Sequence, residues 1–454
     1  MVVGGSIAAL VAADARLRRG GAVELLLPRR GVGGGFAPLE VAGRRLGLGV
    51  RLLEIDREDA GDPPPLSDYR AGFGAHAGFV RRVADVVEGL VGPRLREVDR
   101  PSMAIGGRLV DDVYFTVDLE GLPALLPGDE ARRTAAEAEA ACREGGDAGV
   151  LDGRHDLFSC SLEEASRANH GATFHERFIA SMCAKIHPGG AAAVPAAMRR
   201  KVWMPLFHPR TLARAASGEP TGFRPRRPFH TVEPGGMGAV LEALLERIRR
   251  APGAAFATPG RLEAVARADG GATVLRFEDG TERRVTRPIL GTGPQEIFAA
   301  VGAAYAPARI PMALAWAQVD ERDLLAMPSL VHAPDPEVPA FRVSAAGDDR
   351  PGSRLLTLEL RHDTRPDDVE RAVRDSLELT GLVREGARVD VVHHLVGPAF
   401  PDPSRREVEA FERARAALEA AGLDAEVVGG AAAFGADSFN EQVIQGLRAE
   451  EMIR

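Results

Sequence analysis

The N-terminal residues have types and a spacing that could bind a nucleotide diphosphate. Val2 and Val3 are typical of a strand end. Gly4, Ser6 and Ala9 follow at the spacing G-x-G-x-x-G/A, before an apolar helical stretch. The first position permits a tight turn, the second lets the backbone approach a diphosphate, and the third sets the contact between helix and strand. The helix N-terminus offers N–H groups to the anion. The alternative is a glycine-rich turn that only packs.

The next predicted strand lacks the acidic residue that usually holds a nucleotide ribose. The apolar stretch 22–27 runs directly into Pro28, Arg29 and Arg30. A carboxylate at the end of this strand would bind the ribose hydroxyls, but Glu24 lies too early within the strand. Two outcomes follow: Arg29 or Arg30 contacts the nucleotide instead, or the binding is weakened.

Few side chains are candidates for acid–base or anion-binding chemistry. His208 and His230 flank an arginine-rich stretch and could titrate near neutral pH, although a structural role in that loop is favoured. Arg342 alternates with apolar residues, and its guanidinium could give two parallel hydrogen bonds to a carboxylate or phosphate.

Strand geometry gives Arg342 two alternative roles. In an extended chain, Phe341 and Val343 would share one face, and Arg342 and Ser344 the other. A cation beside a serine suits an anionic substrate. The alternative, which we slightly favour, is an ion pair with an acid such as Glu359 on a neighbouring strand.

The elements that must position these residues follow an α/β pattern. A strand, a turn, a helix and a second strand within the first thirty residues predict the start of a doubly wound fold. A hairpin is predicted over 272–290, with its turn at Asp279 and Gly280, and a long loop over 205–228. Helical patterns cover 74–91, 132–142, 162–186, 238–250, 367–377, 404–420 and 438–453, and strand-like runs cover 314–319, 341–345, 354–360 and 424–429.

Composition excludes several classes of protein. The 454 residues include 57 basic and 65 acidic side chains, a net charge of −8, which argues against a general nucleic-acid binder. Cys142, Cys160 and Cys183 are far apart and predict neither a disulfide framework nor a metal site. No leader pattern and no apolar run of about 18 residues is present, so we expect a cytoplasmic protein without a membrane span.

Two further glycine-rich stretches, 31–36 and 43–51, follow the second strand. They resemble the second glycine motif of a flavoprotein superfamily that includes amine oxidases, protoporphyrinogen oxidases, phytoene desaturases and UDP-galactopyranose mutases. The resemblance implies that Gly33 and Gly34 contact the flavin side of FAD and that Gly49 lies beside the isoalloxazine ring. A glycine-rich surface loop is the alternative.

Later stretches extend the resemblance in the same order along the chain. Residues 229–250 resemble the segment that returns to the cofactor domain, and 256–265 resemble the strand whose backbone contacts adenine, with Leu262 at the matching position. Residues 285–294, which include Gly293, resemble the turn that closes the dinucleotide fold. Residues 427–430 and 434–448 resemble the last strand and helix.

The C-terminal part of the resemblance is altered at one position. Gly430 stands where the superfamily usually has an acid or an arginine that holds the ribityl chain. The helix that follows begins near Asp437 and Ser438, which are good N-cap residues. Its first N–H groups, around Asn440, would face the flavin pyrimidine or a phosphate.

The resemblance implies an α/β fold with a discontinuous Rossmann-like FAD-binding domain and a mixed helical and sheet substrate domain. We expect the FAD-binding domain at 1–85, 229–300 and 395–454, a helical substrate region at 86–228, and a sheet part at 301–394 that floors the substrate pocket. Residues 199–209 and 341–344 are loosely nearest to the mutase-like branch.

The function implied is that of an FAD-dependent oxidoreductase, an oxidase or a dehydrogenase/desaturase. It would act on a C–N or C–C bond of a small or medium metabolite in secondary metabolism, with the flavin accepting the hydride. Lys201 is a candidate because a lysine often stands near the flavin in amine oxidases, although a solvated helix charge explains it better. The rivals are a non-redox flavin mutase or isomerase and a cofactor-free binding or scaffold protein. A small-molecule substrate is the expected partner, and a homodimer is an open alternative.

Overall fold

The chain folds into two compact units, each built from separate stretches of sequence. The computed structural model describes residues 1–29, 31–49, 52–55, 62–72, 75–115, 119–222, 229–327, 329–347 and 349–453. The nucleotide-fold unit comprises Met1–Glu97, Arg227–Pro307 and Arg406–Arg454. The sheet–helix unit comprises Val98–Arg226 and Ala308–Arg405.

A five-stranded parallel sheet organises the nucleotide-fold unit. Its strand order is β10 (Ala254–Ala257), β2 (Val23–Leu26), β1 (Val2–Val3), β14 (Ile289–Leu290) and β20 (Glu426–Val427). Val2 pairs with both Leu25 and Ile289, and Ile289 pairs in turn with Glu426. The chain therefore returns twice to the sheet that its first residues begin.

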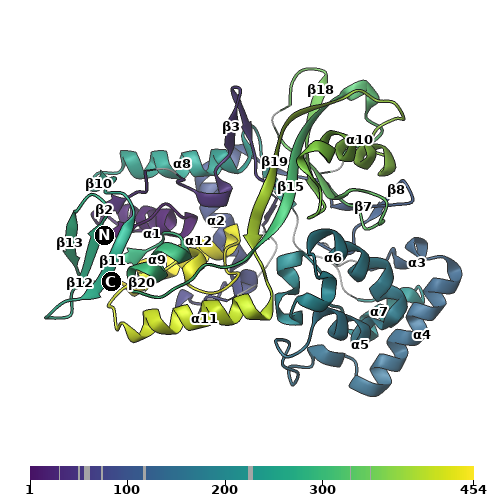
Figure 1. The fold of residues 1–454 in the computed structure, drawn as a ribbon, viewed down its shortest axis with the longest axis horizontal. Helices are drawn as coiled ribbons and strands as arrows, with labels where there is room; N and C mark the ends of the chain where they lie inside the picture. Colours follow the sequence, from purple (N-terminus) through teal and green to yellow (C-terminus); the bar gives the residue numbers. More distant parts are fainter. Residues whose placement is uncertain are drawn as a thin grey trace. The chain divides into compact units, whose positions relative to one another are not determined.

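Helices α1 (Ile7–Arg18) and α12 (Phe439–Met452) pack closely against each other in this unit (Figure 1). Ile7 to Ala13 are all buried, which explains why α1 is apolar on every side. A Cβ added to Gly446 on α12 would lie 2.4 Å from the carbonyl oxygen of Ala8. A glycine is therefore required where the two backbones approach. The same core includes side chains from α2 (Val80–Val91) and α8 (Gly236–Arg250).

The predicted hairpin over 272–290 is wrong at its C-terminal end. Strands β11 (Leu262–Arg267), β12 (Thr273–Phe277) and β13 (Glu282–Val285) form a small antiparallel sheet. Arg287 has a positive φ of 46° and Pro288 follows it, so the chain turns there. Ile289 and Leu290 then enter the parallel sheet. The unit also contains α9 (Pro294–Ala300), α11 (Arg405–Ala420), the hairpin β3 (Leu39–Val41) with β4 (Arg44–Leu46), and the sheet of β5 (Leu53–Glu54), β9 (Phe229–Val232) and β6 (Leu95–Glu97).

A seven-stranded sheet forms the core of the sheet–helix unit. Alternate residues of its strands, such as Leu356, Leu358 and Leu360, form one apolar cluster with helix α10 (Val369–Leu379), which Figure 1 draws beside the sheet. The strand order is β19 (Val389–Pro401), β15 (Arg309–Asp320), β18 (Ser353–Leu360), β17 (Ala340–Ala345), β16 (Leu330–His332), β7 (Ser102–Ile105) and β8 (Arg108–Asp111).

The predicted long loop over 205–228 is wrong in its first half, because Pro209–Ala216 forms helix α7. Proline is compatible with the first helical position, and Leu212 and Ala213 are buried on one side of the helix. Residues 223–228 of that loop lie outside the described part. The other helices are α3 (Leu122–Leu125), α4 (Gly128–Gly145), α5 (Leu162–Phe174), a π-helix (His175–Ala180) and α6 (Ser181–Ile186).

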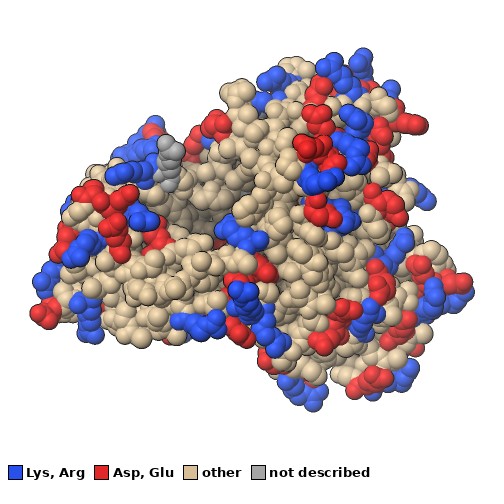
Figure 2. Space-filling view, in the orientation of Figure 1, with Lys and Arg blue, Asp and Glu red and all other residues tan. Residues whose placement is uncertain are grey.

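Two surface properties bear on the possible partners. In the described ranges, no helix combines the length and the apolar character needed to cross a lipid bilayer. Figure 2 shows basic and acidic side chains interspersed over the face in view, without a continuous basic patch.

Candidate functional site

Three glycine turns meet at the carboxyl ends of β1, β14 and β20. Gly4 has a φ of +112°, and a Cβ there would lie 2.3 Å from the carbonyl carbon of Gly291. A Cβ on Gly291 would lie 2.7 Å from the Cβ of Ala9 and 2.9 Å from Oγ of Ser6, and one on Gly429 would lie 3.4 Å from the same Oγ. From β1 the chain continues to β2 on one side, and β14 lies on the other, so this is the switch point where open α/β sheets bind ligands.

Hydrogen bonds within the protein already use several donors of this turn. The Oγ of Ser6 accepts the Ala9 N–H at 3.2 Å, and the Ser6 N–H donates to the Gly291 oxygen at 3.3 Å. The Ala8 N–H points to Oε1 of Gln442 on α12, at 3.5 Å. The first N–H groups of a helix need such partners. The Ser6 and Gln442 oxygens therefore serve as acceptors at the place where an anion would bind.

The structure brings the second glycine motif onto the first. The Gly33 N–H donates to the Gly5 oxygen at 2.7 Å. Gly33 has a φ of +91°, and a Cβ there would lie 2.3 Å from Cδ2 of Leu241 on α8. Gly34 has no atom within 4 Å of its added Cβ. Gly49 has a φ of +77° and lies next to residues outside the described part.

The end of β2 has no carboxylate, as the sequence indicates. Glu24 points instead to Arg283, at 3.4 Å. Arg29 is exposed, and Arg30 lies outside the described residues.

A carboxylate is present nearby, on α9. Oε1 of Glu296 accepts the Leu262 N–H at 2.6 Å, and Oε2 accepts the Thr292 hydroxyl at 2.6 Å. The resemblance assigns the backbone at Leu262 to adenine, and the one hydrogen-bond donor of that backbone is already bonded to Glu296. The sequence does not indicate Glu296 as a site residue, because nothing in the local pattern shows that it reaches the start of β11.

The remaining predicted cofactor residues have mostly local structural contacts. Gly293 is the N-cap residue of α9, and a Cβ on Gly430 would lie 3.7 Å from Cδ of Pro294. The Asn440 amide donates to the Glu54 backbone oxygen at 3.2 Å, which ties the start of α12 to β5.

Arg342 lies in a buried ion pair in the sheet–helix unit. Its Nε and Nη2 donate to the two carboxylate oxygens of Glu359 at 2.7 and 2.6 Å, and Arg342 is 3% exposed. Its guanidinium carbon lies 3.8 Å from the ring centre of Trp203. Arg342 thus forms the ion pair with Glu359 that was the slightly favoured alternative to binding an anionic substrate.

The expected alternation of faces around Arg342 is wrong at Phe341. Phe341 stacks on Trp203, with ring centres 5.9 Å apart, so Phe341 and Arg342 approach the same indole ring. The pairing of β17 with β18 shifts between Ala340 and Arg342. Such an irregularity places two successive side chains on one side.

A buried Asp–His pair lies beside this ion pair, and sequence analysis did not find it. Nδ1 of His332 lies 2.8 Å from Oδ1 of Asp112, and both side chains are fully buried. In the described part of the chain, Nε2 of His332 is buried without a hydrogen-bond partner. His332 pairs with Arg342 across β16 and β17. Asp112 and His332 are 220 positions apart in the sequence, so no local spacing could indicate their contact.

The two lysines of the chain have different environments. Lys201, the predicted candidate, is half-buried in a short 3-10 helix. Lys185 is fully buried on α6, and its Nζ donates to the backbone oxygens of Ala333 and Ala340 at 2.5 and 3.2 Å. Burial lowers the pKa of Lys185 from 10.5 to about 7, against the opposing charge of Asp335.

Replacing Lys185 with methionine is expected to flatten the pH dependence of stability between pH 7 and 8.5. In that window the folded chain loses the Lys185 proton while the unfolded chain keeps it, because the ordinary pKa is 10.5. The unfolded state then binds more protons, so the free energy of unfolding rises with pH, by up to about 1.4 kcal/mol per unit. Urea denaturation at several pH values measures this slope. Lys201→Met is the control and should leave the slope unchanged; an unchanged slope in Lys185→Met would contradict the prediction.

The candidate histidines are not brought together. His208 is exposed at the start of α7, and His230 is buried in β9 of the other unit. His393 stacks on Trp316, with ring centres 5.8 Å apart. Among the described residues, no three His, Cys, Asp or Glu side chains form a metal-binding group.

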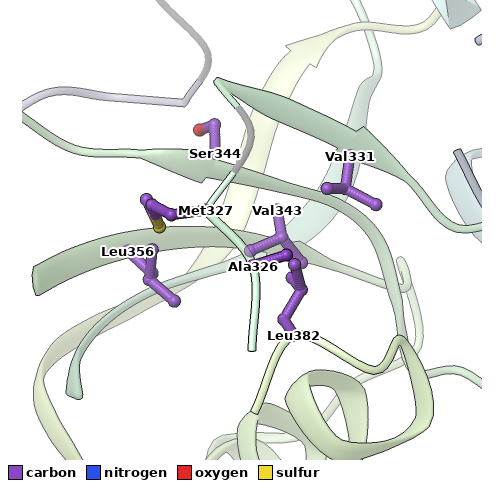
Figure 3. A pocket seen from close by; sticks show the side chains of 7 residues that line it. All are labelled: Ala326, Met327, Val331, Val343, Ser344, Leu356 and Leu382. Carbon is purple, nitrogen blue, oxygen red and sulfur yellow. The ribbon is translucent and has the colours of Figure 1, made fainter. Parts of the chain in front are cut away.

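A small pocket opens within the sheet–helix unit, but it is too small for a metabolite. Figure 3 shows Ser344 at its edge, together with apolar side chains such as Met327 and Leu382. It has room for about one water molecule.

The glycine turns on a parallel sheet define a Rossmann-like dinucleotide-binding fold, and the whole chain shares its fold with solved enzymes of this kind. It is similar to reduced UDP-galactopyranose mutase, at a TM-score of 0.70 and 14% identity, covering 100% of this chain and 93% of that one. It is similar to an oxidoreductase from Methanosarcina mazei at a TM-score of 0.60 and 15% identity, covering 100% of this chain and 99% of that one. It is also similar to a putrescine oxidase variant with redesigned cofactor binding, at a TM-score of 0.56 and 12% identity, covering 100% of this chain and 97% of that one.

These likenesses confirm the predicted fold class and the predicted resemblance at the level of fold. No protein-family model matches the sequence, and no curated protein sequence matches it.

Proposed function

We propose that this protein is an FAD-dependent oxidoreductase that acts on a C–N or C–C bond of a small or medium metabolite. The observation that carries the proposal is the meeting of the Gly4, Gly291 and Gly429 turns beside the N-terminus of α1. A Cβ at Gly4 or Gly291 would collide with the neighbouring turn, so these glycines allow the turns to approach closely at the switch point, where open α/β sheets bind nucleotides. When bound, the flavin supplies the hydride acceptor.

The residues of the nucleotide-fold unit fit the diphosphate part of FAD better than its adenosine part. In this proposal Gly4, Ser6 and Ala9 hold the diphosphate, and Gly33 and Gly34 lie along the flavin side. Gly49 would lie beside the flavin ring, Gly293 and Gly430 would lie at the turns that border the site without a side chain for the ribityl chain, and Asn440 would face the flavin or a phosphate. Arg29 would approach from the surface, and Leu262 would face the adenine.

The sheet–helix unit would supply the substrate side. Arg342, Glu359 and Trp203 contact one another in this unit, and burial strengthens the electrostatic interactions of such a charged group. Lys201 is the candidate for the lysine that stands near the flavin in amine oxidases. Arg342 is the proposed anion-binding residue of this unit.

Substitutions of Ser6 test the cofactor site. Ser6→Leu is expected to abolish FAD binding, because the space beside Gly291 and Gly429 would be filled. Ser6→Gly restores the usual motif and should retain binding, since a glycine N-cap costs only a few tenths of a kcal/mol. The absorbance of purified protein gives the flavin stoichiometry, and near-UV circular dichroism checks the fold. Bound flavin at wild-type stoichiometry in folded Ser6→Leu would show that the assigned site is wrong.

A cofactor-free binding or scaffold protein is the second candidate. It is favoured by the Glu296 carboxylate on the Leu262 N–H and by the missing carboxylate at the end of β2. Wild-type protein that neither carries flavin nor binds added FAD would support it. A non-redox flavin mutase is the third candidate, because the chain shares its fold with the UDP-galactopyranose mutase structure. Such an enzyme would turn over without net oxidation of its substrate.

A further inference from the structure

We propose that Glu296 limits the affinity of this protein for adenosine-containing nucleotides, because its carboxylate occupies donors of the nucleotide site. The inference rests on the proposed function and names a residue that neither the fold nor the glycine motifs assign.

Two hydrogen bonds within the nucleotide-fold unit fix the position of Glu296, and one of its partners lies close to Gly4. Its carboxylate bridges the Thr292 hydroxyl and the Leu262 N–H, both at 2.6 Å. The backbone nitrogen of Thr292 would lie 2.5 Å from a Cβ on Gly4. Glu296 is therefore anchored to the residue that touches the first glycine of the diphosphate turn.

Two physical effects act in the same direction. A nucleotide that uses the Leu262 N–H must first break a charge-assisted hydrogen bond, which is stronger than a neutral one. The carboxylate also repels the negatively charged diphosphate at short range. Glu296 is only partly buried, so water can solvate the Thr292 hydroxyl when the carboxylate is removed.

The sequence around Glu296 offers a matched control. Glu263 follows Leu262 directly, is 44% exposed in its side chain, and lies 3.7 Å from Arg261. Glu263→Ala removes the same charge from the same neighbourhood but leaves the Leu262 N–H bonded to Glu296. Any difference between the two variants therefore reports the contact itself.

The test is a titration of full-length wild type, Glu296→Ala, Glu296→Gln and Glu263→Ala with FAD, ADP and FMN, by flavin fluorescence or calorimetry. Glu296→Ala should bind FAD and ADP at least tenfold more tightly than wild type, which is about 1.4 kcal/mol. FMN, which lacks adenosine, should gain less. Glu296→Gln keeps an acceptor for the Leu262 N–H without the charge, so its affinity should lie between those of wild type and Glu296→Ala. Glu263→Ala should change affinity less than twofold.

The outcomes separate this inference from the proposed function. If wild type binds FAD and Glu296→Ala binds it equally or more weakly, the inference is overturned and the proposed function stands. An equal gain for FMN, or an equal gain in Glu263→Ala, would also overturn it, because the effect would then be general electrostatics. If no variant binds FAD, both proposals fail.

Discussion

Replacing Arg342 with alanine is expected to lower the free energy of unfolding by about 3–5 kcal/mol, because the Glu359 carboxylate would remain buried without its partner. Both side chains are less than 10% exposed, and both nitrogen–oxygen contacts are short. Trp203 would also lose the guanidinium over its ring. The chain has two tryptophans, Trp203 and Trp316, and both lie in the sheet–helix unit. Tryptophan fluorescence during urea denaturation therefore reports this unit directly.

A double substitution separates the ion pair from a role in binding. Arg342→Met combined with Glu359→Leu should recover most of the lost stability, because an apolar pair often replaces a buried ion pair at little cost. A stable Arg342→Ala protein with a raised KM for substrate would instead assign Arg342 to anion binding.

Gly446→Ala is expected to destabilise the nucleotide-fold unit by about 1–3 kcal/mol, through overpacking between α1 and α12. The added methyl would lie 2.4 Å from the Ala8 oxygen, and that contact is backbone. Alanine normally stabilises a helix relative to glycine by roughly 0.5–1 kcal/mol. At this position the expected change in the free energy of unfolding has the opposite sign.

Gly89→Ala on α2 provides the comparison for Gly446. The nearest atom to a Cβ at Gly89 is Nη1 of Arg247, at 3.7 Å, so this variant should have an equal or higher melting temperature than wild type. Melting curves by circular dichroism measure both. A gain in stability in both variants would mean that the helices separate easily.

The sequence is most informative where neighbouring residues determine the structure. The turn at Gly4, Ser6 and Ala9 depends on one strand, one turn and one helix, and all three are encoded within about twenty residues. The pairing of Arg342 with Glu359 was also predictable, because charges inside apolar strands require partners.

Contacts between distant strands could not be predicted in this way. His332 lies on β16 and Asp112 directly follows β8, and the two approach because β7 pairs with both β16 and β8. The shared contact of Phe341 and Arg342 with Trp203 depends on a register shift that simple alternation does not contain. Lys185 looks like an ordinary helix lysine in the sequence, and its burial follows from the packing of α6 on β17.

The strand order of the nucleotide-fold unit has a consequence for synthesis on the ribosome. Strand β1 is made first, yet its neighbour β14 contains residues 289–290, and the edge strand β20 contains residues 426–427. Helix α12, which packs against α1, is made later than all of these strands. The face of α1 that packs on α12 therefore stays without that partner until residues 439–452 have been made. Both segments of the sheet–helix unit end by residue 405. That unit can be complete while the unit begun by the first residues is still unfinished.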